Sequence, residues 1–185
     1  MESARSEIKF RRIFDEHFDA VNRYCLRRLS RDDANDAAAQ VFVVAWRKID
    51  KMPHGEGALP WLYAVARLEV STMRRSVRRL KALRERLGGM APPGARGPDA
   101  VVVRRSEHEA VIEALRSLSR GDREVVFLRS YEELSTPHIG VVLGCSTEAA
   151  KKRLSRALKR LRKAAGLPGP AASLSTRAIK EGGDE

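Results

Sequence analysis

The sequence predicts an all-α fold of two small helical domains joined by a flexible linker. Apolar residues recur at helical spacing through most of the 185 residues, and β-branched residues do not alternate with polar ones as they would in strands. Glycine and proline gather in GGMAPPGARGPDA (88–100), whose composition cannot pack a core. We therefore expect domains at 8–86 and 105–165, a linker at 87–104 and a disordered tail at 166–185.

Three helices are expected in the first domain. The first covers 8–29, and the second covers 32–51 after a polar break. The segment MPHGEG (52–57) predicts a turn by its proline and glycine content. The third helix is expected to begin near Ala58 or Pro60, because proline suits a first helical turn, and to continue into a strongly basic stretch.

Four shorter helices are expected in the second domain, at 106–118, 122–130, 136–143 and 146–164. Asp122 and Ser146 are the predicted N-caps of the second and fourth of these helices. Ser135 or Thr136 is the predicted N-cap of the third, and Pro137 is tolerated in its first turn.

The last two helices predict a helix-turn-helix. The first of them is apolar and stops at Gly144, and the second starts at Ser146. Leu154, Leu158 and Leu161 share one face of the second helix because they are spaced i, i+4, i+7. Its charged residues from 151 to 163 are all cations: Lys151, Lys152, Arg153, Arg156, Lys159, Arg160, Arg162 and Lys163. A basic second helix after a tight turn is typical of proteins that insert this helix into the DNA major groove.

The formal net charge of +12 predicts a polyanionic partner. Nucleic acid is the first candidate for that partner, and an acidic membrane surface is the second. No apolar run reaches the roughly 20 residues that span a bilayer, and the N-terminus lacks the apolar segment of a signal peptide. The sequence therefore predicts a cytoplasmic protein without membrane insertion.

The chain carries no pattern typical of catalysis or of a cofactor. It has no Gly-rich phosphate loop, nucleophile motif or clustered His, Cys or carboxylate residues. His54 has no partner at metal-binding spacing, so no metal site is expected. Cys25 and Cys145 lie far apart and are expected to be free thiols. We therefore expect neither an enzyme nor a bound cofactor.

The first half of the chain contains the motifs ANDAAAQVFVVAWRKID (34–50) and LPWLYAVARLEVSTMRRSVRR (59–79). They resemble regions 2.2 to 2.4 of the extracytoplasmic-function (ECF) sigma factors, the two-domain promoter-recognition subunits of bacterial RNA polymerase. The matching positions are Ala34, Asp36, Phe42, Ala45, Trp46, Trp61, Leu62, Tyr63, Ala66 and Arg67. Leu68 stands where the family pattern has Asn, and Ala39 and Gln40 stand where it has a Gln-Glu pair.

The second half resembles region 4 of the same family from residue 114 to residue 162. The matching positions include Leu118, Arg123, Leu128, Leu134, Ser135, Ile139, Leu143, Gly144, Ser146, Lys151, Arg153, Leu154, Arg156 and Ala157. Region 4 alone is shared with other helix-turn-helix regulators. Both blocks in order across a linker are more specific, and they imply a protein that binds core RNA polymerase and directs promoter-specific initiation.

The resemblance implies that the second domain reads the −35 promoter element. The first two turns of a recognition helix face the bases, and Lys or Arg can bind guanine there. The candidate −35 residues are Lys151, Lys152, Arg153, Ser155 and Arg156. Cations farther along the helix are expected over backbone phosphates, which position the protein without reading sequence. These are Lys159, Arg160 and Arg162.

The first domain, by the same resemblance, holds the −10 element and docks on the clamp helices of the polymerase largest subunit. The candidate −10 residues are Met52, His54, Trp61, Arg67, Leu68, Arg74, Arg75 and Arg78, and Trp61 is also a candidate core residue. The candidate polymerase contacts are Asn35, Asp36, Gln40 and Arg47. The family also implies an anti-sigma protein that binds between the two domains.

Two other functions are compatible with the basic helices. One is a dimeric helix-turn-helix regulator that binds a palindromic operator, although no coiled-coil seam is present to form the dimer. The other is a basic module that binds RNA or an acidic membrane regardless of sequence. Each basic or polar face is also compatible with a simple solvated helix surface.

Overall fold

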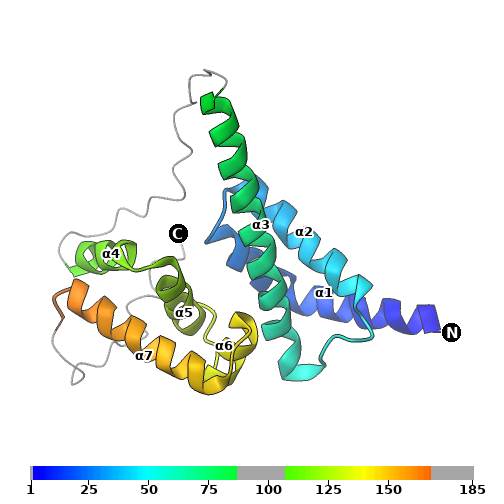
Figure 1. The fold of residues 1–185 in the computed structure, drawn as a ribbon. Helices are drawn as coiled ribbons and strands as arrows, with labels where there is room; N and C mark the ends of the chain where they lie inside the picture. Colours follow the sequence, from blue (N-terminus) through cyan, green and yellow to red (C-terminus); the bar gives the residue numbers. More distant parts are fainter. Residues whose placement is uncertain (1, 87–106, 168–185) are drawn as a thin grey trace. The chain divides into compact units, whose positions relative to one another are not determined.

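The computed structural model describes residues 2–86 and 107–167, and its regular elements in these ranges are all helical (Figure 1). The helices form two compact units, each with its own core. The predicted all-α fold is therefore confirmed. The predicted linker (87–104) and residues 168–185 of the predicted tail lie outside the described residues.

The first unit consists of three helices that pack in pairs, α1 (Glu2–Leu26), α2 (Arg31–Arg47) and α3 (Ala58–Arg86). A 3₁₀ turn, η1 (Gly55–Gly57), precedes α3. The Ser30 side chain caps α2 by accepting a hydrogen bond from the backbone N–H of Asp33. The predicted starts of α2 and α3 agree closely with the structure, whereas α1 begins before residue 8 and α2 ends before residue 51.

The core of the first unit lies where the apolar stripes of its helices meet. Its fully buried residues include Val21, Tyr24, Val41, Leu62 and Ala66. Aromatic rings extend this core toward the surface, because Phe42 of α2 contacts a row of rings along α1: Phe10, Phe14 and Phe18. Aromatic pairs of this kind add to the stabilisation from burial.

The second unit consists of α4 (Glu107–Ser117), α5 (Arg120–Ser130), α6 (Thr136–Leu143) and α7 (Thr147–Ala164). Helix α7 packs against each of the other three helices. Its buried face includes the small residues Ala150 and Ala157, both 0% exposed, which let neighbouring helices approach closely. Leu161 is also buried, and Leu154 and Leu158 are half-buried, as their spacing predicted.

Local signals set the helix ends around the turn. The Ser146 side chain caps α7, as predicted, and of the two residues predicted for α6, Ser135 and Thr136, it is Ser135 that caps the helix. Gly144 ends α6 with φ 67°, a left-handed conformation that other residues adopt only with strain. Gly140 approaches the turn so closely that an added Cβ would lie 2.9 Å from the carbonyl oxygen of Cys145. The absence of a side chain at Gly140 therefore keeps the turn tight.

The prediction of Asp122 as an N-cap was wrong. Ser119 is the N-cap of α5, and its hydroxyl oxygen accepts a 3.1 Å hydrogen bond from the backbone N–H of Asp122. Asp122 is therefore the third residue of the helix, where a carboxylate also favours the positive end of the helix dipole. This arrangement leaves the Asp122 carboxylate available to a neighbouring helix.

Two further predictions concern sulfur chemistry and membranes. Cys25 and Cys145 are not disulfide-bonded. Within the described ranges, none of the helices has both the length and the apolar character that a bilayer crossing requires.

Candidate nucleic-acid interface

The candidate −35 residues form an exposed basic face on α7. Lys151, Lys152, Arg153, Ser155 and Arg156 are all exposed, and Arg153 lies nearest to the buried stripe of Ala150 and Ala157. Four of the five line a shallow hollow together with Glu148: Lys151, Lys152, Ser155 and Arg156. The structure therefore brings four of the predicted residues together and leaves Arg153 outside the hollow.

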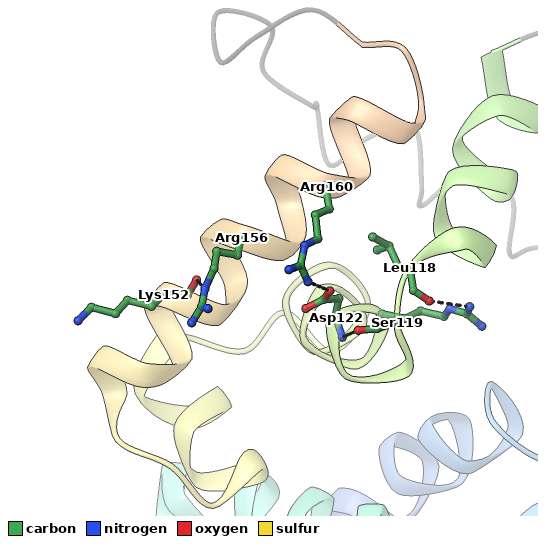
Figure 2. A network of polar contacts seen from close by, with 7 residues as sticks. Leu118, Ser119, Asp122, Lys152, Arg156 and Arg160 are labelled. Atoms are coloured by element: carbon green, nitrogen blue, oxygen red, sulfur yellow. Dashed lines mark hydrogen bonds and ion pairs between the residues drawn. The ribbon is translucent and has the colours of Figure 1, made fainter.

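The side chains of this face differ in how freely they project. In Figure 2 the Lys152 side chain extends away from α7, while that of Arg156 turns back along the helix. Arg156 Nε donates a 3.2 Å hydrogen bond to the carbonyl oxygen of Lys152. Because this bond uses one edge of the guanidinium, its terminal nitrogens can still donate to an acceptor outside the protein.

The three residues predicted to contact the DNA backbone divide into two groups. Lys159 is exposed and Arg162 is half-buried near the end of α7. Arg160 instead forms an ion pair with Asp122 of α5, although its side chain is 62% exposed (Figure 2). Sequence spacing gave no signal for this pair, because its members are 38 residues apart.

Asp122 is one of the few buried charged residues in the described part of the chain, at 8% exposed. Burial by itself raises the pKa of this carboxyl group. Hydrogen bonds with Arg160 and Ser119, and the positive charges of Arg160 and Arg153, outweigh burial and lower the pKa of Asp122 below its ordinary value. The carboxylate is therefore held in its charged form.

Arg123 fixes the support on which α7 rests. Its guanidinium donates hydrogen bonds to the carbonyl oxygens of Leu115, Arg116 and Leu118, at 2.8, 2.6 and 3.2 Å. These carbonyls lie at and just beyond the end of α4, where a helix has no backbone donors for them. Arg123 thus ties the end of α4 to the start of α5.

The candidate −10 residues lie on α3 and on the loop before it. Leu68 is 60% exposed, Arg75 and Arg78 are exposed, and Trp61 and Arg67 are half-buried. Arg74 donates two hydrogen bonds to the carbonyl oxygen of Arg28, so its guanidinium is held against the turn that follows α1. Arg78 Nε in turn donates to the carbonyl oxygen of Arg74 at 3.2 Å.

The loop before α3 offers fewer groups to a ligand than its sequence suggested. Met52 is only 2% exposed and belongs to the core, so its side chain has no surface for a base in this structure. His54 is exposed, with Nε2 3.4 Å from Lys9 Nζ of α1. Lys9 Nζ also donates a 2.5 Å hydrogen bond to the carbonyl oxygen of Ile49. The loop is therefore tied to α1, and His54 is its exposed candidate.

The candidate polymerase contacts form a second exposed surface, on α2. Asn35, Asp36, Gln40 and Arg47 are all exposed. Val43 lies among them at 38% exposed, and residues 36, 40, 43 and 47 follow one another at helical spacing. We call these residues, 35, 36, 40, 43 and 47, the α2 face, with Asn35 at its edge. A partly exposed valine among polar side chains is compatible with a protein-binding surface.

Comparisons with known proteins assign both units. Residues 13–80 match the family described as Sigma-70 region 2, and residues 108–161 match Sigma-70, region 4. The ECF RNA polymerase sigma factor SigL of Mycobacterium tuberculosis is 31% identical over 160 residues, which cover 82% of this chain and 86% of SigL. The chain belongs to the ECF sigma factors. It therefore acts in transcription initiation by RNA polymerase.

Other relatives agree with this assignment. The RNA polymerase sigma factor NccH of Alcaligenes xylosoxydans xylosoxydans is 28% identical over 70% of this sigma factor and 71% of NccH. The structure of RpoE in complex with the anti-sigma factor NepR from Bartonella quintana has the same fold, with a TM-score of 0.60 and 24% identity over 84% of this sigma factor and 95% of RpoE. The structure of CnrH with the cytosolic domain of CnrY gives a TM-score of 0.56 at 22% identity, over 83% and 85% of the two chains.

Sequence reasoning missed three features of the second unit. Glu148 lines the hollow beside the −35 candidates, and its position in the first turn of α7 was readable from the sequence. Arg123 was identified only as a matching position of the family, without its contacts to α4. The Asp122–Arg160 ion pair had no signal in the sequence, because it depends on how α7 packs on α5.

Proposed function

We propose that this sigma factor reads the −35 element as duplex DNA with α7 and holds the −10 element with α3 and the loop before it. The α2 face docks on the largest subunit of RNA polymerase in the same complex. Residues 8–86 and 105–165 act as the two promoter-binding domains, and residues 87–104 connect them. The observation that carries the proposal is the exposed basic face of α7, presented by a tightly capped helix-turn-helix.

Reading of the −35 element is assigned to the residues around the hollow on α7. Lys151, Lys152 and Arg156 supply donors for guanine O6 and N7, Ser155 can donate or accept, and Arg153 contacts bases or phosphates. Lys159 and Arg162 lie farther along the helix, where contacts to phosphates fix the register of the protein on DNA.

The −10 assignment rests on charge and exposure along α3. Arg75 and Arg78 are exposed and contact phosphates, and Arg67 and Arg74 extend the same basic surface. His54, Trp61 and Leu68 are the groups offered to an unstacked base of the opened strand, which favours stacking and contacts to its edges. Each lost phosphate contact would lower the salt dependence of binding.

Regulation and location follow from the same assignment. RpoE is bound to the anti-sigma factor NepR in its structure, and CnrH is bound to the cytosolic domain of CnrY. We propose that an anti-sigma protein also binds this sigma factor. It works in the cytoplasm, where promoter DNA and polymerase are found. It has no catalytic activity of its own and needs no cofactor.

Transcription in vitro from a promoter library tests the proposal. Core polymerase with the wild-type protein is expected to initiate from a subset of promoters that share −35 and −10 sequences. Replacing Arg156 by Ala is expected to weaken recognition by about 1–3 kcal/mol at one −35 position and to relax base preference there. Lys159→Ala is the matched control, and it is expected to weaken all promoters about equally.

Several results would contradict the proposal. No initiation from any library member would exclude a sigma factor that acts with that polymerase. An unchanged −35 preference in the Arg156→Ala protein would exclude base reading by Arg156. Binding of the isolated protein as a stable dimer to a palindromic site would favour an operator-binding regulator instead.

A further inference from the structure

The ion pair between Arg160 and Asp122 joins the recognition helix to the helix beneath it (Figure 2). In Figure 2 the Arg160 side chain leaves α7 and reaches the Asp122 carboxylate at the start of α5. Asp122 is 8% exposed, whereas the Arg160 side chain is 62% exposed. Arg160 therefore supplies the ion pair of a largely buried carboxylate, and Arg153 adds a second positive charge to its surroundings.

Asp122 is well fixed as the anchor of this pair. Its backbone N–H donates to the Ser119 cap, so the residue sits in the rigid first turn of α5. The same turn is tied to α4 through Arg123. The charges of Arg160 and Arg153 help keep the pKa of Asp122 below its ordinary value, so the carboxylate is ionised at neutral pH. A fixed, charged anchor restricts any helix that binds to it.

Arg160 lies in a position where such a restriction matters for DNA reading. It follows Arg156 by four residues, so the two side chains leave α7 on the same side, one turn apart. A guanidinium is planar and pairs with a carboxylate in a directed geometry. Holding Arg160 against α5 therefore restricts rotation of α7 about its own axis. The restriction acts one turn away from Arg156, which lines the hollow.

We propose that Arg160 and Asp122 are positioning residues for −35 recognition, and that Arg160 is not a phosphate contact. This inference rests on the proposed function of α7. It replaces the expectation from sequence, in which Arg160 was one of the cations over the DNA backbone. The pair sets the angle at which Lys152, Ser155 and Arg156 meet the base edges.

Two simple charge arguments separate this role from phosphate binding. The slope of log affinity against log salt is negative, and we give it as a magnitude. Neutralising a residue that binds a phosphate lowers this slope by about 0.9, whereas neutralising a positioning residue leaves it unchanged. Removing the Asp122 carboxylate takes a negative charge out of a DNA-binding domain. Electrostatics alone would therefore make Asp122→Ala bind DNA more tightly, while loss of positioning makes it bind the cognate site more weakly.

The experiment uses holoenzyme assembled from core polymerase and the full chain. Promoter affinity is measured over a range of KCl concentrations, on a promoter selected from the library and on the same promoter with its −35 element substituted. The variants are Arg160→Met, Asp122→Ala and the double variant, with Lys159→Met as the neighbouring exposed cation. Far-UV circular dichroism of each protein checks that the helices are retained.

We expect both single variants to lose preference for the −35 element by a similar factor, without a change in the slope of log affinity against log salt. Arg160→Met and Asp122→Ala each lower the preference for the selected −35 element by about two- to tenfold, and the double variant loses no more than either one. Their salt slopes equal that of the wild type, whereas Lys159→Met lowers the slope by about 0.9. If Arg160→Met loses helix, Asp122→Ala carries the decision, because it removes the other partner of the ion pair and leaves Arg160 in place.

Three outcomes would overturn the inference. The first is a slope lowered by about 0.9 in Arg160→Met, which would make Arg160 a phosphate contact. The second is equal or tighter binding of the selected promoter by Asp122→Ala. The third is wild-type holoenzyme that ignores the −35 substitution. That result overturns the proposed function as well, and it is recognised without any variant.

Discussion

Arg123 offers a direct test of how the recognition helix is supported. Its guanidinium holds three carbonyl oxygens at the end of α4, those of Leu115, Arg116 and Leu118. The bond to Arg116 is exposed, so water can replace it, and the other two are partly buried. Two such bonds at a net of about 1 kcal/mol each predict that Arg123→Ala lowers the free energy of unfolding of this unit by about 2 kcal/mol.

A loss of this size is measurable by thermal unfolding. For a domain of 60–100 residues, 1 kcal/mol corresponds to about 4–8 °C, so the melting temperature of the α4–α7 unit should fall by about 8–16 °C. Far-UV circular dichroism follows the helices of both units. Both tryptophans of the chain, Trp46 and Trp61, lie in the α1–α3 unit, so tryptophan fluorescence follows that unit alone.

The matched control is Arg120→Ala, which removes an equal charge from an exposed position three residues away. We expect it to change the free energy of unfolding by less than about 0.5 kcal/mol. An Arg123→Ala protein that melts like the Arg120→Ala protein would refute the role given to the three hydrogen bonds. An equal shift of the transition detected by tryptophan fluorescence would show that the effect of Arg123→Ala is not confined to the α4–α7 unit.

Two further predictions concern the turn and the buried carboxylate. Gly144→Ala places a side chain on a residue with the left-handed φ of 67°, so urea denaturation should show a loss of about 1–2 kcal/mol in the free energy of unfolding. Gly121→Ala, at an exposed site without positive φ, should show no such loss. The folded-state pKa of Asp122 lies below its unfolded value, so its ionised form stabilises the fold. That contribution is complete above the unfolded pKa and is lost as the pH falls through the lowered folded pKa. The difference in unfolding free energy between wild type and Asp122→Asn should therefore be constant near neutral pH and shrink below about pH 4. A difference that grows in acid would contradict the sign of the shift.

Much of the helix-turn-helix was predictable because its signals are local. Ser135, Gly144 and Ser146 act on backbone groups within a few residues of themselves, so their roles follow from residue type and spacing. The error at the start of α5 shows the limit of such signals. Ser119 and Asp122 both suit the beginning of a helix, and only the structure shows that Ser119 is the cap and Asp122 the third residue.

The helical class, the order of the elements and the cationic face of α7 could be read from the sequence, because helical periodicity and capping depend on neighbours along the chain. Tertiary structure alone decided that Met52 is buried, that Arg123 holds the end of α4, and that Arg160 pairs with an acid 38 residues away. These contacts depend on how helices pack against one another. Side chains that look equivalent on a helical projection therefore become different once a neighbouring helix supplies a carboxylate, a carbonyl or an apolar surface.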